Sequence, residues 1–543
     1  MSADLSTAFM SGNLFKSLAT VSGLTLVSRV MGFARQVLVA GVIGAGGNPV
    51  ADAFWAAFRL PNMFRRLFAE GAFQAAFVPL FQGRLVSEDK AAAKQFAEEV
   101  MAFLLCILLG LTVLVEIFAP LAVHGVASGF ADDAEKFDLT TLYLRIMFPY
   151  LACMSMVGLL SGVLNSLDKF MAYAAAPLIL NFCQIAAIVL TADGTLEVSG
   201  EALAWGTAVS GFLQLALLVW GARRQGYWLR LRIPKLTPGV KRLLVLGGPG
   251  FLSAGATQIN VIIGTNIASQ EPGAVSWLMN ADQLYQLPLA VIGTALGVVL
   301  LPMLSRRVKE GDEAGAMHAV NRSIELSSVL VLPAAAAFIV MSMQIIDALF
   351  RGFATDALSL FGGRTSAFTA DDVKWTGWAL AIYGWGLPAF VWQRIFAPAF
   401  FAREDTRAPM NYALISIGVN TGLSLMLFPV FGFLAVAFAT VFAAWLQLIQ
   451  LGWSLWRRGQ FKPDPRLKER FPRIALATLA LAATVVFALQ HTTFLAGFVF
   501  DREWVVIFLI AGLGVALYGA LLLGLGGVKL SDYKAYGRKR DVF

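Results

Sequence analysis

Residues 504–526 read WVVIFLIAGLGVALYGALLLGLG, a run of 23 residues without a charged side chain. A helix needs about 20 apolar residues to cross a bilayer, and about fourteen runs of roughly this length recur from Asn13 to Gly526. Lipid offers no partner for backbone N–H and C=O groups, and the strands of membrane barrels are shorter and alternate in polarity. The sequence therefore predicts an all-α polytopic membrane protein with about fourteen transmembrane helices and no separate globular domain.

The composition of the whole chain agrees with this run. Of its 543 residues, 58% are hydrophobic and 14% are charged, and the mean hydropathy is +0.71. In soluble domains about a quarter of the residues are charged, so lipid is the expected solvent here. The net charge of +8 raises the question of a nucleic-acid partner, which the positions of the cations decide.

Basic residues concentrate in alternate gaps between the apolar runs. The gap 223–242 holds seven Lys or Arg and no acid, the gaps 457–473 and 529–540 are also basic, and intervening gaps such as 132–135 are acidic or neutral. Because Lys and Arg concentrate in cytoplasmic loops, we expect the basic gaps and both termini to face the cytoplasm. This topology and attraction to anionic membrane lipids account for most of the net charge, so a nucleic-acid role has no support. The longer loop 347–374 is the exception to this rule, because it contains basic residues although the alternation places it outside.

Residue types that often bind metals or react form no pattern in this chain. The cysteines lie inside apolar runs, where a thiol behaves as a small hydrophobe, and the histidines are scattered. They are Cys106, Cys153, Cys183, His124, His318 and His491. We therefore expect no metal, disulfide or cofactor. The N-terminus lacks the small-residue cleavage site of a secretory signal, and no Gly-Lys-Ser/Thr phosphate loop indicates ATP hydrolysis.

A weak internal repeat divides the chain. The order of features from Ala51-Asp52 through Leu60-Pro61 and Val78-Pro79 recurs from Ala281-Asp282 through Leu287-Pro288 and Leu301-Pro302. Related halves are how many transporters build two gates around one site. We expect an N-terminal bundle of helices 1–6 (1–225), a basic cytoplasmic linker (226–245), a C-terminal bundle of helices 7–12 (246–457), a second basic linker (458–472), two appended helices (473–526) and a cytoplasmic tail (527–543).

Five arginines lie in the first two apolar segments: Arg29, Arg35, Arg59, Arg65 and Arg66. A charge at the centre of a bilayer costs at least about 2.5 to 3.5 kcal/mol, so such residues normally face a bundle interior or a watery cavity. On an ideal helix Arg29 and Arg35 point about 120° apart, and Gly32 between them would allow a bend. Alternatively, some of these arginines lie near a membrane surface and snorkel, or pair with Asp52 and Glu70.

An excess of guanidinium groups in a watery vestibule is a site for an anion. The planar fork of arginine binds phosphate or pyrophosphate with two parallel hydrogen bonds. We therefore expect an amphipathic anionic substrate.

Several motifs resemble one known family. The runs are Ser28 to Arg35 (SRVMGFAR), Ala51 to Phe54 (ADAF), Phe58 to Phe73 (FRLPNMFRRLFAEGAF), Phe148-Pro149-Tyr150, Val275-Ser276-Trp277, Gly293 to Gly297 (GTALG) and Arg394 to Pro398 (RIFAP). Together they are similar to the signature of the MurJ (MviN) family of lipid II flippases. The resemblance covers nearly the whole chain and is faint after about Lys462.

The resemblance implies a fold of the multidrug/oligosaccharidyl-lipid/polysaccharide flippase superfamily. Two pseudo-symmetric bundles would surround a central cavity, and the two C-terminal helices would form a groove for the undecaprenyl tail. The substrate would be lipid II, flipped from the cytoplasmic to the outer leaflet of the bacterial inner membrane by alternating access for cell wall synthesis. The partners would be proteins of cell wall synthesis, and no cofactor is implied.

The resemblance also implies a set of site residues. Arginines of the first two helices would bind the pyrophosphate of the substrate, and Asp52 matches an acidic position near the outer end of the second helix. The candidates for substrate binding are Arg29, Arg35, Arg59, Arg65, Asp52 and Arg394. The candidates for gating or for the second-half cavity are Asp282, Gln283, Gln286 and Glu70.

One segment departs from the family pattern. Family members often have Arg and then Glu where this chain has Gln283 and Gln286. Either this is a dispensable ion pair that was lost as a unit, or Arg394 supplies the missing cation. We favour the first interpretation.

Two other functions would use part of the same pattern. An exporter of drugs or of another polyprenyl-linked saccharide would share the architecture, but a carrier of cationic drugs should present intramembrane carboxylates instead of arginines. A transferase acting on polyprenyl phosphates needs acidic metal-binding clusters, whereas the pairs Asp132-Asp133 and Asp371-Asp372 lie in expected outer loops. We expect a transporter driven by the membrane potential or a coupling ion, since each charge moved is worth about 2.3 kcal/mol per 100 mV.

Overall fold

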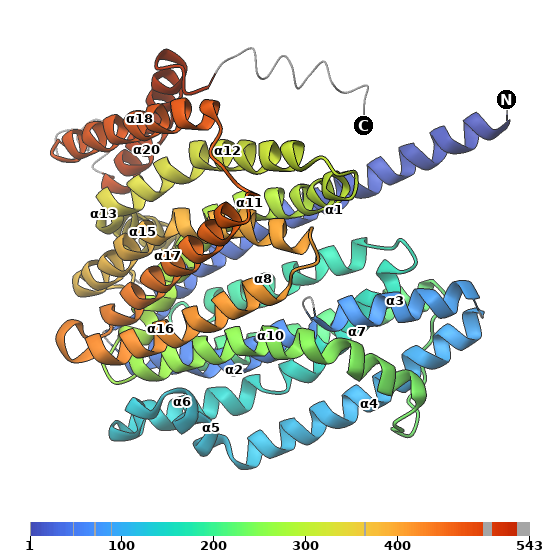
Figure 1. Cartoon of the computed structure of the whole chain (residues 1–543). Helices are drawn as coiled ribbons and strands as arrows, with labels where there is room; N and C mark the ends of the chain where they lie inside the picture. Colours follow the sequence, from blue (N-terminus) through green and yellow to red (C-terminus); the bar gives the residue numbers. More distant parts are fainter. Residues whose placement is uncertain are drawn as a thin grey trace. The chain divides into compact units, whose positions relative to one another are not determined.

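The computed structural model of the chain describes residues 2–46, 48–69, 72–87, 89–362, 365–491 and 502–528. The regular secondary structure in these ranges is entirely helical, and they contain no strand (Figure 1). This confirms the all-α fold class. The described residues form two compact units.

Unit 1 comprises residues 1–276 and 354–368. Its helices are α1 (Ser2–Ile43), α2 (Pro49–Ala69), α3 (Ala72–Ser87), α4 (Lys90–Ile117), α5 (Ala119–Val126), η1 (Ser128–Asp132), α6 (Ala134–Met147), α7 (Tyr150–Asn165), α8 (Met171–Leu190), α9 (Leu196–Arg224), α10 (Pro238–Ala268) and α14 (Ala354–Ser359). Within it α8 packs between α1 and α9, and α2 packs against α6 and α7.

Unit 2 comprises residues 277–353 and 369–543. Its helices are most of α11 (Ala274–Lys309), α12 (Glu313–Val340), α13 (Ser342–Ile346), the π-helical turn η2 (Asp347–Phe353), α15 (Ala370–Phe401), α16 (Arg407–Phe431), α17 (Leu434–Arg457), α18 (Pro465–Leu489) and α20 (Glu503–Gly524). The helix α15 packs against α12 and α17, and α18 packs against α12 and α20. The division after Ser276 does not coincide with the linker 226–245, and the arrangement in two pseudo-symmetric bundles stays a prediction.

Ten helical segments within the described residues are long and apolar enough to cross a membrane. They are Gly23–Ile43 of α1, α4, α6 with α7, α8, α9, α12, α16, α17, α18 and α20. Four further helices, α2, α10, α11 and α15, have 21 to 36 residues but are not among the ten. The predicted number of about fourteen requires these four to cross as well, and it is not confirmed.

Large apolar side chains are exposed on these helices. Leu190, Met426 and Val515 are 84%, 76% and 72% exposed. In water such surfaces would cost about 25 cal/mol per Å² of apolar area, whereas lipid tails solvate them. The exposed faces therefore fit a chain whose helices are surrounded by lipid.

Part of the loop 347–374 returns to the first helix. Ala367 N–H donates a 2.7 Å hydrogen bond to Gly41 O, and a Cβ on Gly41 would lie 2.8 Å from Ala354 Cβ. At the end of the helix, Gly44 has φ = +71°, a conformation that favours glycine, and its Cβ position lies 2.8 Å from Ala367 O. Residues 354–362 and 365–368 thus lie against the end of α1 and belong to unit 1.

Candidate functional site

The arginines of the first two helices are not deeply buried. On α1, Arg29 is exposed and Arg35 half-buried, while Arg59, Arg65 and Arg66 on α2 are half-buried. Between the two α1 arginines, Gly32 lies against α8, where a Cβ would be 3.5 Å from Asn181 Nδ2. That amide donates to Ser28 O at 3.0 Å, so α8 holds α1 at this level.

Arg35 and Arg65 are brought together from two helices. The side chain of Arg35 interacts electrostatically with Arg65 of α2 and with Tyr150, the first residue of α7. Its Nε atom is buried and makes no hydrogen bond to any described residue. Like charges repel, so an anion that contacts both guanidinium groups would be favoured here.

The Arg65 side chain is oriented by its own helix. Its Nε and one terminal nitrogen donate to Asn62 Oδ1 at 3.1 and 3.0 Å. Asn62 therefore fixes the orientation of the guanidinium. Pro61 precedes this pair within α2, where it removes one backbone hydrogen bond of the helix.

Asp52 lies on α2 and is 0% exposed. Its carboxylate accepts hydrogen bonds from Gly273 N–H (2.7 Å), from Ser276 N–H (3.0 Å) and from the Ser276 hydroxyl (2.7 Å). Lys136 Nζ of α6 lies 3.3 Å from the same carboxylate and is itself buried. The partners of Asp52 are therefore Lys136 and the start of α11, and not the arginines with which one interpretation of the sequence paired it.

These contacts saturate the Asp52 carboxylate. An ionised carboxylate has about four lone-pair positions, and four donors approach this one. In this conformation Asp52 offers no position to a substrate. The arrangement is a clamp that joins α2, α6 and the first turn of α11, and Lys136 is a member that the sequence did not single out.

The second-half candidates lie in unit 2. Gln286 Nε2 donates to Asp282 Oδ2 within α11, and Asp282 also hydrogen-bonds Tyr285. Arg394 of α15 is exposed, and its side chain packs against Gly293 of α11. A Cβ added at Gly293 would lie 2.7 Å from a nitrogen of the Arg394 guanidinium. Gln283 is half-buried. Whether Arg394 replaces a family cation stays a prediction.

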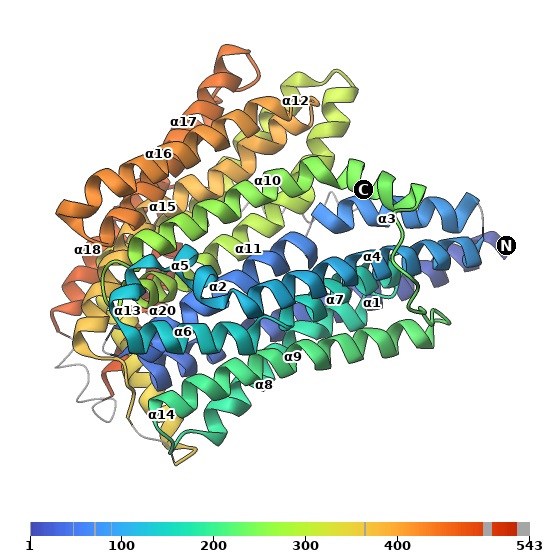
Figure 2. The ribbon, with the colours of Figure 1, turned by 90° about the horizontal axis from the view of Figure 1, so that it is seen from below.

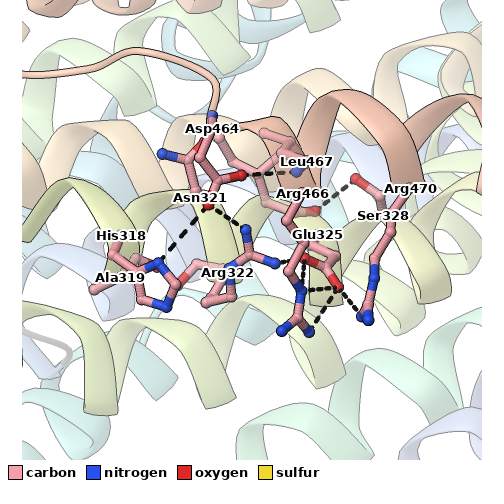
Figure 3. Close-up of polar contacts among 12 residues, drawn as sticks. His318, Ala319, Asn321, Arg322, Glu325, Ser328, Asp464, Arg466, Leu467 and Arg470 are labelled. Atoms are coloured by element: carbon pink, nitrogen blue, oxygen red, sulfur yellow. Dashed lines mark hydrogen bonds and ion pairs between the residues drawn. The ribbon is translucent and has the colours of Figure 1, made fainter. Parts of the chain in front are cut away.

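A cluster of ion pairs that the sequence did not single out joins α12 to α18 (Figure 3). Glu325 is 3% exposed, and Arg470 Nη1 and Arg466 Nη2 approach its carboxylate at 2.6 and 3.1 Å. Arg322 contacts both Glu325 and Asp464. Figure 3 shows these side chains converging from both helices, which fixes the start of α18.

Asp464 caps α18 at one edge of this cluster. Burial alone would raise the pKa of its carboxyl, but donation from Leu467 N–H (2.7 Å) and from the Arg322 guanidinium outweighs burial and holds the pKa below its usual range. The carboxylate is thus stabilised in its charged form.

Glu70 and the acidic pairs of the expected outer loops remain to be placed. Glu70 lies outside the described residues. Within the described parts of the chain, no group of three His, Cys, Asp or Glu residues could hold a metal ion. Asp133 and Asp372 instead cap the starts of α6 and α15 through Lys136 N–H and Thr369 N–H.

Comparison with known proteins identifies the family. A family model described as "Lipid II flippase MurJ" matches residues 39–513. A relative from Rhizobium meliloti (strain 1021), named "Probable lipid II flippase MurJ", is 44% identical over 525 residues, which cover 96% of this chain and 95% of the relative. The chain belongs to the MurJ family. It is therefore a transporter and not an enzyme.

Other comparisons agree with this family assignment. "Lipid II flippase MurJ" from Burkholderia cenocepacia is 36% identical over 476 residues, which cover 87% of this chain and 89% of the relative. A solved structure described as "Lipid II flippase MurJ, inward closed conformation" has a TM-score of 0.74 at 22% identity and covers 92% of this chain and 98% of its own. An inward-facing multidrug resistance MATE transporter of the MOP superfamily has a TM-score of 0.61 at 16% identity, with coverage of 80% and 98%. These two likenesses show the shared fold alone.

Proposed function

We propose that this chain flips lipid II from the cytoplasmic to the outer leaflet of the bacterial inner membrane. Its membership of the MurJ family and the names of its relatives support this substrate. The observation on which the proposal chiefly rests is the pair Arg35 and Arg65, with a buried Arg35 Nε that hydrogen-bonds no described residue. The likeness to MATE transporters supports no second substrate, since it concerns the fold alone.

The arginine pair engages the pyrophosphate of the substrate. A pyrophosphate offers several charged oxygens, and guanidinium groups bind such oxygens in parallel pairs. Bringing the two cations of α1 and α2 onto one diphosphate removes their mutual repulsion and satisfies Arg35 Nε. Arg29 and Arg59 are further contacts along the same two helices.

The Asp52 clamp acts as a gate. Its contacts with Gly273, Ser276 and Lys136 close α2 onto α6 and the start of α11. A cycle of alternating access has to break this clamp and form it again. Opening leaves the buried Asp52 and Lys136 without each other unless water or substrate enters, so the opening step is coupled to hydration of the site.

The two C-terminal helices hold the lipid tail. Buried side chains of α18 and α20, among them Leu481, Val485, Ile510 and Tyr518, pack into one apolar cluster with residues of unit 2. The Tyr518 hydroxyl donates to Val329 O of α12 at 3.0 Å and fixes α20 there. The exposed apolar faces of these helices are then available to the hydrocarbon chain.

The cycle uses the membrane potential. Each charge that crosses the full field is worth about 2.3 kcal/mol per 100 mV, so an inside-negative potential drives the empty, cationic site back toward the cytoplasm. Both termini face the cytoplasm in this scheme, and cell wall synthesis proteins receive the product. Collapse of the potential at a constant proton gradient should slow flipping; unchanged flipping would contradict this coupling.

Depletion of the protein tests the proposed function. In cells from which this chain is removed, lipid II should accumulate in the cytoplasmic leaflet, and re-expression should restore its export. The measurement is the fraction of lipid II that an externally added, membrane-impermeant enzyme can modify. An unchanged outer-leaflet fraction after depletion would overturn the proposal.

A further inference from the structure

The connection between α9 and α10 is an ordered segment without helix or strand. It runs from Tyr227 to Leu236, and we call residues 227–236 the strap (Figure 2). Tyr227 is 1% exposed and its ring lies 6.0 Å from that of Phe81 in α3. Lys90 Nζ lies over the same ring at 5.0 Å. The beginning of the strap is therefore anchored on unit 1.

A buried carboxylate of α4 fixes the middle of the strap. Glu98 is 2% exposed and accepts hydrogen bonds from Arg230 N–H (3.1 Å) and Arg232 Nε (2.6 Å). Just after the strap, the Thr237 hydroxyl donates to Glu99 Oε2 at 2.8 Å. Three polar contacts over eight residues hold the segment in one course along α4.

Despite these anchors the strap exposes large apolar side chains. Trp228, Leu231, Ile233 and Leu236 are 54%, 73%, 79% and 51% exposed. A segment fixed by its backbone and by one arginine therefore presents apolar groups outward. Exposed apolar patches of this kind mark surfaces that another apolar phase covers.

The cations of the strap leave a positive charge beside the apolar groups. Glu98 neutralises Arg232, whereas the side chains of Arg230 and Lys235 form no ion pair with the described residues. The whole gap 223–242 contains no acidic residue. A partner for this surface should therefore be both anionic and apolar.

The neighbouring aromatic residues indicate at which level of the membrane the strap lies. Trp220 on the last turns of α9 is half exposed, and Arg224 stacks over it at 3.9 Å, while Arg223 stacks over Trp228 at 3.6 Å. Tryptophan is enriched where membrane-spanning segments meet the headgroup layer, and Lys and Arg snorkel toward that layer. The strap begins three residues after the end of α9, so it lies at the same level.

We propose that the strap is a binding surface for anionic phospholipid headgroups at one face of the membrane. Leu231 and Ile233 enter the boundary between headgroups and acyl chains, and Arg230 and Lys235 bind lipid phosphates. Arg232 and Glu98 keep the strap on α4, so that lipid binding there also sets the level of α4. This surface is separate from the substrate site and does not depend on the identity of the substrate.

Binding of phosphatidylglycerol and phosphatidylcholine to the purified full-length protein tests this surface. A cation near an anionic surface contributes about 1 kcal/mol, or about fivefold in affinity, so Arg230→Gln with Lys235→Gln should weaken the tightest phosphatidylglycerol site by about 25-fold. Arg230→Gln leaves the anchor intact, because its backbone N–H donates to Glu98. The matched control is Lys462→Gln with Lys468→Gln, which removes two exposed cations from another basic gap and should change affinity less than twofold.

A probe on the strap provides the second measurement. A fluorophore at an Ile233→Cys substitution, in a background whose own cysteines are replaced and whose unfolding temperature is checked, should be quenched by spin-labelled lipid in nanodiscs containing phosphatidylglycerol. It should be shielded from iodide in water. The proposal is overturned if iodide alone quenches the probe, if both lipids bind equally, or if the control pair weakens binding as much as the strap pair.

Discussion

The hydroxyl of Ser276 donates a 2.7 Å hydrogen bond to the buried Asp52 carboxylate, across 224 residues of chain. The backbone N–H of Ser276 donates to the same oxygen at 3.0 Å. These two bonds join the first turn of α11 to α2. The Asp52 clamp is therefore stabilised in part by Ser276, an uncharged side chain.

Replacing Ser276 with Ala should destabilise the protein by about 2 kcal/mol, because a hydrogen bond to a buried charge is lost. The measurement is the unfolding free energy in detergent. Ser161→Ala is the control, since Ser161 is equally buried but its hydroxyl bonds only Val157 O of its own helix. Equal losses of unfolding free energy in the two variants would show that the bond to Asp52 stabilises the protein no more than a bond within one helix.

Glu325→Gln should destabilise the protein by about 3 to 5 kcal/mol, because it removes the buried negative charge that Arg322, Arg466 and Arg470 share. Arg470 is 7% exposed and Arg322 13%. Glu469→Gln on α18 is the control: Glu469 is 59% exposed and pairs with Arg473. Such an exposed pair contributes about 0 to 1 kcal/mol. A similar loss of unfolding free energy in both variants would contradict the larger contribution expected of the buried cluster.

Asp464 predicts a dependence of stability on pH. Its pKa is held below the usual value, so the charged carboxylate stabilises the fold above the unfolded pKa of about 3.9. This contribution is lost as the pH falls through the lower, folded pKa. Asp464→Asn keeps an oxygen to cap Leu467 but has no charge to lose. Between about pH 5 and pH 2 its stability should therefore fall less than that of the wild type; parallel curves would exclude the effect.

The helix α14 and residues 365–368 should move away from the end of α1 when Gly41 is replaced by Ala. The added Cβ of Gly41→Ala lies 2.8 Å from Ala354 Cβ, closer than two carbons can approach. The measurement is the labelling rate of a cysteine at Ser366, which should rise. Gly23→Ala on the same helix meets no atom within 4 Å and serves as the control. An unchanged rate in Gly41→Ala would show that the segment accommodates the methyl group.

Much of the fold was predictable from the sequence because each membrane helix satisfies its own backbone hydrogen bonds. Runs such as 504–526 therefore fix a helix without reference to the rest of the chain. The arginines of α1 and α2 could also be singled out, because a charge in an apolar run is rare and expensive.

The partners of the buried charges were not predictable. Lys136 lies 84 residues from Asp52, and Arg470 lies 145 residues from Glu325. Such pairs depend on how helices pack, and no local pattern encodes them. For Lys136 one signal existed: it is the single cation in the acidic stretch from Asp132 to Asp138. The number of membrane-spanning helices was harder to predict, because some helices, such as α2 with its four charged side chains, have an interrupted apolar pattern.

Flipping by Arg35 variants tests the central claim most directly. The protein would be reconstituted in vesicles with lipid II, and the fraction of lipid II accessible from the opposite leaflet would be measured over time. Arg35→Ala should reduce the rate at least about tenfold, Arg35→Lys should retain part of it as a point charge, and Arg145→Ala, which removes an exposed guanidinium of the same unit, should leave it unchanged. A correctly folded Arg35→Ala protein that flips lipid II at the wild-type rate would contradict the account.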